Sequence, residues 1–244
     1  MIGIALVTGA GGGLGTAICK VLAKKGFRII AVDLLEEEKL KNQLSEIRAS
    51  LELIFGGVDF SKPEVVTAIV ESFLPNKNWT VLVNNAGISI GGKLIDGTLE
   101  QWNAMMNVNL TVPFVLSQAF VRNVNKTGGG GSIINISSMA GIIGAKKPGY
   151  AASKAGLIGL TKAVAMQVGP NIRCNAVYPG AMNTPMTADW DQKTRQAIAK
   201  NTPIGRIAEP EEIAQIVAFL ADSEQSGFLT GAIINATGGQ YLGQ

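Results

Sequence analysis

Short apolar runs alternate with segments of helical periodicity along the whole chain of 244 residues. The apolar runs lack polar alternation, so each is expected to be a strand buried on both faces. Seven such runs are found, at residues 4–7, 28–33, 51–58, 80–84, 132–136, 172–178 and 232–235. Helical patterns lie at residues 16–25, 35–50, 62–74, 99–123 with a break or kink near Pro113, 150–168, 210–220 and, within a loop, 182–201. This alternation predicts one α/β domain over residues 1–244, a doubly wound and mostly parallel seven-stranded sheet with helices on both faces.

The chain contains no histidine, which excludes two classes of catalytic site. A Ser-His-Asp hydrolase and a zinc site with histidine ligands both need that residue. Any general acid or base must therefore be Tyr, Lys, Asp, Glu or Cys. The two cysteines, Cys19 and Cys174, have no neighbouring cysteine at metal-ligand spacing, so we expect two buried core residues and no metal site.

Charge is low and scattered: 16% of the residues are charged, and the net charge is +3. The lysine pairs at 24–25 and 146–147 are too short for a nucleic-acid-binding stripe and are interpreted as solvated side chains. The first residues carry no charged leader, and no apolar stretch approaches about 18 residues without a charge. These features predict a cytoplasmic protein with no nucleic-acid and no membrane partner.

The turn after the first apolar run is rich in glycine and reads T-G-A-G-G-G-L-G over residues 8–15. It departs from the strict spacing G-x-G-x-x-G, but it fits T-G-x-x-x-G-x-G with Gly9, Gly13 and Gly15. Glycines let the backbone approach a pyrophosphate, whose charge is met by the N-terminus of the next helix. Between a first strand and a helix, this turn predicts a dinucleotide site.

An acidic residue follows the second strand pattern, as in many dinucleotide sites. Asp33 lies 18 residues after Gly15, where its carboxylate can accept hydrogen bonds from both adenosine ribose hydroxyls. The alternative for Asp33 is a turn or helix-capping residue. Asp59, after the third strand, either hydrogen-bonds the adenine or begins the next helix. Asn84, the first residue of N-N-A-G, serves either the cofactor or the backbone of the sheet.

The chemistry centres on the segment Y-A-A-S-K at residues 150–154. Tyr150 and Lys154 are four residues apart on a predicted helix, so they share one face and the ammonium lies near the phenol. A free phenol has a pKa of about 10, and a fixed cation beside it favours the phenolate. Ser138 closes the fifth strand twelve residues upstream, where its hydroxyl could hold a substrate oxygen against Tyr150. Tyr150 is therefore the predicted acid/base.

In this order along the chain, the glycine loop, N-N-A-G, the strand-end serine and Y-x-x-x-K resemble the short-chain dehydrogenase/reductase family. The resemblance covers residues 4–239 and implies a Rossmann-type domain. It places the catalytic roles of that family on Ser138, Tyr150, Lys154 and, in addition, Asn109. Asn109 lies in a helical V-N segment, and its local alternative is an amide that caps the kink near the following proline.

The resemblance also implies contacts to the cofactor. The P-G turn Pro179-Gly180 would lie beneath the nicotinamide, Thr184 would contact its carboxamide, and Lys154 would bind its ribose hydroxyls. The residues expected to contact the dinucleotide are Gly9, Gly12, Gly13, Leu14, Gly15, Asp33, Leu34, Asp59, Phe60, Asn85, Ala86, Gly87, Tyr150, Lys154, Pro179, Gly180 and Thr184. NAD is expected rather than NADP, because Asp33 would repel a 2′-phosphate and the glycine loop has no Arg or Lys to bind one.

The expected function is an NAD(H)-dependent oxidoreductase that transfers a hydride between nicotinamide and a secondary alcohol or ketone. An NADPH-dependent 3-oxoacyl-[acyl carrier protein] reductase is the closest alternative, because much of the chain is similar to that subfamily. A non-catalytic dinucleotide sensor is less favoured.

Residues 182–206 are expected to form a lid over the substrate. The expected pocket wall is Ile88, Ile90, Ile142, Ile143, Met182, Met186 and Trp190. This wall favours a fairly apolar substrate, unless the same residues only pack the lid. Family members usually pair through two long helices and the last strand, and the helix at 150–168 has surplus apolar residues at Leu157, Ile158, Leu160 and Val164. We therefore expect a homotetramer.

Overall fold

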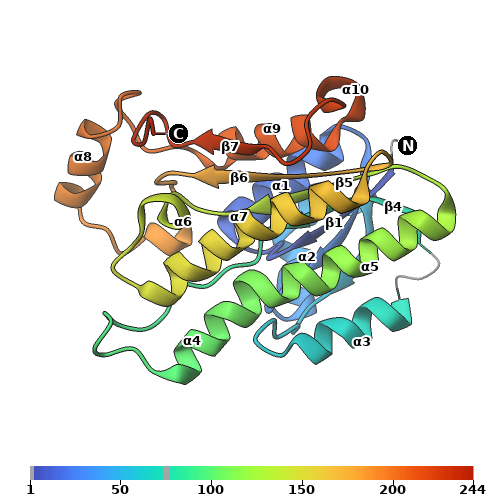
Figure 1. Cartoon of the computed structure of the whole chain (residues 1–244), viewed down its shortest axis with the longest axis horizontal. Coiled ribbons are helices and arrows are strands. Elements are labelled where there is room, and N and C mark those ends of the chain that lie inside the picture. The colour runs from blue at the N-terminus through green and yellow to red at the C-terminus, as the bar shows by residue number, and fades with distance from the viewer. Residues whose placement is uncertain (1–2, 74–76, 244) are drawn as a thin grey trace.

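The computed structural model describes residues 3–73 and 77–243. Its centre is a seven-stranded sheet in which all neighbouring strands are parallel, in the order β3-β2-β1-β4-β5-β6-β7 (Figure 1). The strands are β1 (Gly3–Thr8), β2 (Phe27–Val32), β3 (Leu51–Phe55), β4 (Trp79–Asn84), β5 (Gly131–Ile136), β6 (Ile172–Pro179) and β7 (Ile233–Ala236). The strand order reverses between β1 and β4, so the crevice at their carboxyl ends is where doubly wound folds bind ligands.

Helices cover both faces of this sheet (Figure 1). Those of the described residues are α1 (Gly13–Lys24), α2 (Glu37–Gln43), α3 (Pro63–Phe73), α4 (Leu99–Met106), α5 (Val112–Thr127), α6 (Ala140–Ile143), α7 (Pro148–Val168), α8 (Gln192–Lys200), α9 (Pro210–Ala221) and α10 (Ser223–Ser226). α1 packs on α9 on one face, while α5 packs on α3 and α7 on the other. Successive residues of β1 point to opposite faces, so Ala5 and Val7 join one apolar cluster and Leu6 joins the other.

Two predicted elements are shorter than the sequence pattern indicated. The helix expected over 35–50 is divided into α2 and a 3-10 helix, Ser45–Ser50. Ile47, with a φ of −112° and a ψ of 20°, interrupts the helical backbone within this segment, and its side chain is buried. The strand expected to reach residue 58 ends at Phe55, because Gly57 has a φ of 71° and breaks the extended backbone. The expected helix end at Leu74 lies outside the described residues.

The long helical pattern is irregular one turn before Pro113. Between α4 and α5, residues Asn107–Thr111 form a π-helical segment. Proline has no N–H, so it cannot complete the regular helical bond to the carbonyl of Asn109 four residues earlier. The helix is therefore irregular where a break or kink was predicted, but its helical backbone continues through the π-helical segment, which includes the residue expected to complete the catalytic set. Asn109 itself is fully buried.

Within the described residues, the stretch Leu99–Thr127 is long and apolar enough to span a membrane by length and composition alone. Its packing explains this composition. Phe120 is fully buried and meets Trp79 of β4 edge to face, with ring centroids 5.1 Å apart. Leu116 and Val124 are buried beside it. The stretch is accounted for as a core helix of the α/β domain.

Both cysteines are buried in the core, as predicted. Burial raises the pKa of the Cys174 thiol to about 12 and raises that of Cys19 as well. Neither thiol is therefore ionised near neutral pH. The described part of the chain also contains no group of three or more Cys, Asp or Glu residues that could hold a metal ion.

Candidate active site

The glycine loop joins β1 to α1 in a shape that leaves no room for a side chain at Gly9 or Gly15. Gly9 has a φ of 64°, and a Cβ there would lie 2.9 Å from the Ala86 Cα. A Cβ on Gly15 would overlap the Gly9 carbonyl oxygen. α1 begins at Gly13, its N-cap residue Gly12 provides no side-chain cap, and its first turn has no acidic residue. The N-terminus of α1 thus keeps its positive end available, and the loop fits the pyrophosphate of a dinucleotide.

Asp33 follows β2 and is nearly buried, with 9% of its surface exposed. Its Oδ2 accepts a hydrogen bond from the Gly11 backbone N–H and its Oδ1 accepts one from Leu35, both at 2.8 Å. The alternative role as a turn residue is therefore present in the structure. The ribose-binding role is still compatible with it, because each carboxylate oxygen can accept a second hydrogen bond. Leu34, the next residue, is exposed.

Asp59 also makes the local contacts of its alternative role. Its Oδ1 accepts hydrogen bonds from the Ser61 N–H and hydroxyl at 2.9 and 2.6 Å, just before α3. Phe60 is buried in the core. A backbone bond of 2.9 Å from Val58 N to Asp33 O keeps this segment at the carboxyl edge of the sheet, next to the glycine loop.

The N-N-A-G segment ties β4 to its neighbours. Asn84 donates to the Asn135 side chain at 2.8 Å, so its structural role is real. Asn85 donates from its Nδ2 to the Thr8 and Gly9 carbonyls at 2.9 and 3.1 Å. The Thr8 hydroxyl accepts from the backbone N–H groups of Asn85 and Ala86. Thr8 had no predicted role, although it is the first residue of the T-G-x-x-x-G-x-G pattern.

Ser138, Tyr150 and Lys154 converge at the carboxyl end of β5. The Ser138 side chain lies near enough to the Tyr150 phenol to lower its pKa. Lys154 is 3% exposed, and its ammonium donates to the Ile136 carbonyl at 2.8 Å. A Cβ on Gly87 would lie 3.1 Å from the Lys154 Nζ, so N-N-A-G closes over the lysine. Two loops and one helix thus meet around a phenol, a hydroxyl and an ammonium.

The pKa of Tyr150 differs from the expectation. The sequence predicted that Lys154 lowers it, but burial raises the pKa of the phenol, and the nearby Ser138 side chain offsets this only in part. Burial also lowers the pKa of Lys154 to about 8. The expected lowering by Lys154 is therefore wrong for the chain by itself. A phenol with a raised pKa stays protonated near neutral pH, which suits proton donation to a carbonyl oxygen.

Asn109 links the site to the loop after β4. Its Oδ1 accepts from the Ile88 N–H at 2.9 Å, and its Nδ2 donates to the Ile88 carbonyl and to the Ser153 hydroxyl at 3.0 and 2.9 Å. Ser153 in turn donates to the Tyr150 carbonyl at 2.9 Å. The Asn109 side chain thus holds the pocket loop against α7. Ser153 was not predicted, although it lies within the Y-A-A-S-K segment.

The predicted lid segment, residues 182–206, approaches the glycine loop near its start, at Thr184 and Pro185. A Cβ on Gly13 would approach Pro185 Cδ to 2.8 Å and Thr184 Cβ to 3.1 Å. Pro179 ends β6, and Gly180 follows it. These positions bring the P-G turn and Thr184 to the crevice where a bound dinucleotide would pass.

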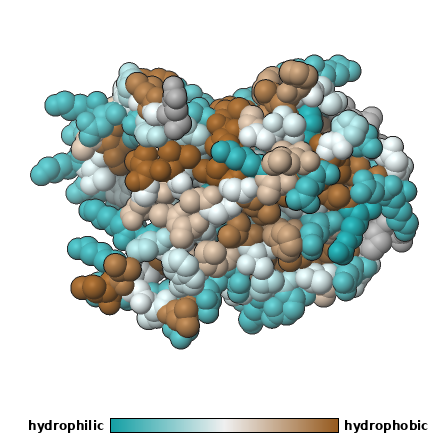
Figure 2. Space-filling model, in the orientation of Figure 1, coloured by the Kyte–Doolittle hydropathy of each residue, from teal (hydrophilic) through white to brown (hydrophobic). Residues whose placement is uncertain are grey.

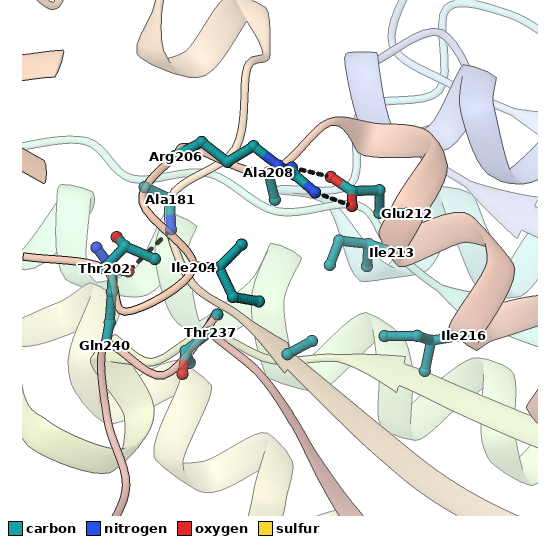
Figure 3. Close-up of a pocket in the computed structure, with 12 residues that line it drawn as sticks. Ala181, Thr202, Ile204, Arg206, Ala208, Glu212, Ile213, Ile216, Thr237 and Gln240 are labelled. Atoms are coloured by element: carbon teal, nitrogen blue, oxygen red, sulfur yellow. Dashed lines mark hydrogen bonds and ion pairs between the residues drawn. The ribbon is translucent and has the colours of Figure 1, made fainter. Parts of the chain in front are cut away.

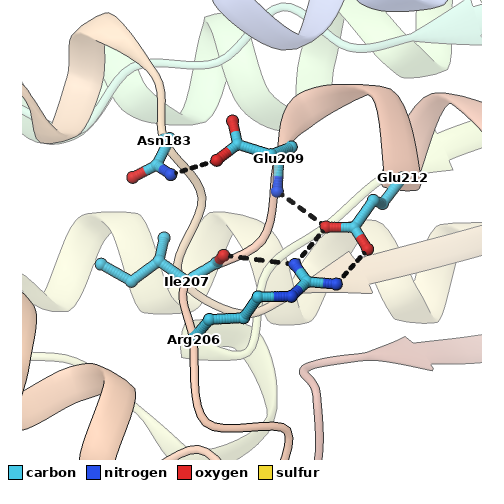
Figure 4. A network of polar contacts seen from close by, with 5 residues as sticks. All are labelled: Asn183, Arg206, Ile207, Glu209 and Glu212. Atoms are coloured by element: carbon cyan, nitrogen blue, oxygen red, sulfur yellow. Dashed lines mark hydrogen bonds and ion pairs between the residues drawn. The ribbon is translucent and has the colours of Figure 1, made fainter.

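Hydrogen bonds connect the two ends of the predicted lid segment (Figure 4). Asn183 donates to the Glu209 carboxylate, and Met182 forms a β-bridge with Ala208. Arg206 forms a bidentate ion pair with Glu212 of α9, with both N···O distances 2.6 Å. This pair holds the pKa of Glu212 at about 2. The beginning of the predicted lid segment and the residues that follow its end are therefore held together, next to the N-terminus of α9.

A cavity of about 150 Å³ lies behind this anchor, between the end of the predicted lid segment, α9 and the residues that follow β7 (Figure 3). Its walls include Ile204, Ile213 and Ile216, and the Arg206–Glu212 pair lies beside it (Figure 3). None of Ser138, Tyr150 and Lys154 lines it. This cavity is thus separate from the site at β5.

Known proteins with the same architecture resemble the chain over nearly its full length. A family model described as enoyl-(acyl carrier protein) reductase matches residues 9–240. A 3-oxoacyl-[acyl-carrier-protein] reductase from Thermotoga maritima is 39% identical over 98% of both chains. Trans-4-hydroxycyclohexanecarboxylate dehydrogenase from Sinomonas cyclohexanicum is also 39% identical, over 98% of this chain and 93% of its own.

Solved structures agree with these sequence relatives. 4-Hydroxyisoleucine dehydrogenase complexed with NADH has a TM-score of 0.88 at 28% identity, covering 99% of this chain and 100% of its own. A Beutenbergia cavernae protein described as an NAD(P)-dependent gluconate 5-dehydrogenase, with bound NADP, has a TM-score of 0.90 at 31% identity, covering 97% and 96%. Fold, glycine loop and relatives together define an oxidoreductase that acts on CH–OH groups with NAD(P). The chain belongs to the short-chain dehydrogenase/reductase family.

Proposed function

We propose that the protein is an NAD(H)-dependent oxidoreductase that interconverts a secondary alcohol and a ketone, with Tyr150 as its acid/base. The observation that carries this proposal is that Ser138 lies close to the Tyr150 phenol, while the buried Lys154 ammonium is held on the Ile136 carbonyl at the end of the same strand. The test is a panel of secondary alcohols and ketones assayed with both nicotinamide cofactors. A protein that binds a cofactor but turns over none of the panel would support a dinucleotide sensor instead.

Each polar group then has one task. The nicotinamide ring supplies or accepts the hydride when bound. Tyr150 transfers a proton to or from the substrate oxygen, and Ser138 holds that oxygen by a hydrogen bond. Lys154 places a positive charge beside the site and would bind the ribose hydroxyls. Asn109 keeps the loop after β4 in position through Ile88.

The choice of NAD rests on Asp33 and on the uncharged glycine loop. The nearly buried carboxylate of Asp33 would repel the additional phosphate of NADP. The second candidate, an NADPH-dependent 3-oxoacyl-[acyl carrier protein] reductase, is favoured by the name of the Thermotoga relative at 39% identity. Cofactor preference separates the two candidates.

The substrate would meet a mainly apolar wall. Ile88, Ile142, Met182 and Trp190 are half-buried, whereas Ile90, Ile143 and Met186 are exposed. This arrangement supports a carbon skeleton that is largely apolar around the reacting carbon. The relatives named for 4-hydroxyisoleucine, gluconate and trans-4-hydroxycyclohexanecarboxylate all have substrates that carry a carboxyl group as well.

We also expect a homotetramer. Leu157 is buried in the core and cannot contribute to an interface, but Phe114 on α5 and Met166 on α7 are 45% and 89% exposed. β7 is an edge strand, and Figure 2 shows apolar side chains gathered along this side of the sheet. Exposed apolar surface of this kind favours association. Light scattering at micromolar concentration should give four times the 25.5 kDa of one chain. A monomer under these conditions would contradict the proposal.

A further inference from the structure

Lys147 differs from its neighbour Lys146. Lys146 is exposed, and in the described part of the chain no hydrogen bond or ion pair includes it. Lys147 is half-buried, and its ammonium donates to the Ser89 carbonyl at 2.8 Å. The interpretation of both lysines as solvated side chains is therefore right for Lys146 and wrong for Lys147. The side chain of Lys147 turns toward the loop after β4.

That loop is a wall of the active site. Ser89 lies between Ile88, which Asn109 holds, and Ile90. Gly87, two residues earlier, faces the Lys154 ammonium, since a Cβ added there would lie 3.1 Å from it. Two residues of extended chain span at most about 7 Å, so the carbonyl that binds Lys147 is close to the reacting groups. Lys147 also lies only three residues before Tyr150 in the sequence. Its contact with the loop after β4 and its position just before Tyr150 both place the Lys147 ammonium at the edge of the substrate pocket.

The charge of Lys147 has no counter-charge in the described residues. None of their ion pairs includes it, and the first turn of α7 contains no acidic residue. An ammonium has three N–H donors, and the Ser89 carbonyl uses one of them. A half-buried cation with free donors beside an otherwise apolar wall is suited to an anion, which would satisfy both its charge and its hydrogen bonds.

We infer that Lys147 binds a carboxylate of the substrate, so that the substrate class is an oxo acid or hydroxy acid with a short apolar chain between its carboxylate and its reacting carbon. The inference rests on the proposed function and deepens it. In this arrangement Ser138 and Tyr150 bind the reacting oxygen, the apolar wall packs on the chain, and Lys147 fixes the opposite end. Lys147 is then a specificity-determining residue.

The test compares acids with neutral analogues of the same length. Wild type and the variants Lys147→Met, Lys147→Arg and Lys146→Met are assayed for reduction of 3-oxobutanoate, 4-oxopentanoate, 5-oxohexanoate and their three methyl esters. We expect wild type to prefer one acid over its ester. Lys147→Met should lower kcat/KM for that acid about 10- to 100-fold, mainly through KM, and change the ester by less than about 2-fold. Lys147→Arg should keep part of the preference for the acid over its ester, and Lys146→Met should keep all of this preference.

Other outcomes would overturn the inference in different ways. Equal losses for acid and ester in Lys147→Met would mean that Lys147 only holds the loop through Ser89. An unchanged kcat/KM for the preferred acid in Lys147→Met would mean that Lys147 does not contact the substrate. A wild-type enzyme that reduces esters or simple ketones but no acid would reject the inference while the proposed function stands. If wild type reduces no ketone with either cofactor, the proposed function fails as well.

Discussion

The variant Tyr150→Phe should lose at least about 100-fold in kcat, because it lacks the hydroxyl that transfers the proton. The aromatic ring is kept, so its packing should not change. The Lys154 ammonium donates to the Ile136 carbonyl and not to the phenol, so its position does not depend on the lost group. Cofactor affinity should therefore stay close to that of wild type.

Two measurements make this result specific. Thermal unfolding and cofactor titration by fluorescence should be nearly the same in wild type and Tyr150→Phe. The control Tyr241→Phe makes the same chemical change in the segment after β7, outside the Ser138 set, and should keep full activity. Turnover of Tyr150→Phe near the wild-type rate would end the proposed mechanism, whichever substrate is used.

Wild type should prefer NAD over NADP by roughly 30- to 1,000-fold in kcat/KM, which corresponds to about 2–4 kcal/mol. The additional phosphate of NADP would lie within a few ångströms of the Asp33 carboxylate. The three glutamates that follow, Glu36, Glu37 and Glu38, are paired with lysines of α2, so the repulsion is assigned to Asp33 itself. No lysine or arginine occurs in the loop at residues 8–15 to offset it.

The double variant Asp33→Ser with Leu34→Arg should shift this preference toward NADP, because it removes the repulsion and adds a phosphate-binding guanidinium. Asp33 also accepts hydrogen bonds from the backbone N–H groups of Gly11 and Leu35, and replacing it changes these bonds. The single variant Leu34→Arg and the melting temperatures of all variants are therefore needed as controls. If wild type uses NADPH as well as NADH on one substrate, Asp33 is a turn residue only. The 3-oxoacyl-[acyl carrier protein] reductase alternative would then be preferred.

The sequence alone was sufficient to predict the sheet and the place of the chemistry. Each apolar run became a parallel strand. A strand that helices cover on both faces is apolar on both faces, so its sequence is a continuous apolar run. The glycine loop, Ser138, Tyr150 and Lys154 follow the ends of such strands or lie one loop later. Parallel strands bring these ends to one edge, so the order of motifs already implied their proximity.

The tertiary structure alone decided what individual polar groups do. Asn85 binds the Thr8 and Gly9 carbonyls, and Lys147 turns from solvent to Ser89, across 58 residues of sequence. The raised pKa of Tyr150 likewise depends on what covers the ring and not on its spacing to Lys154. Periodicity reports which face of an element is apolar, because that property is local. Burial and hydrogen-bond partners depend on segments distant in sequence, so only the folded chain determines them.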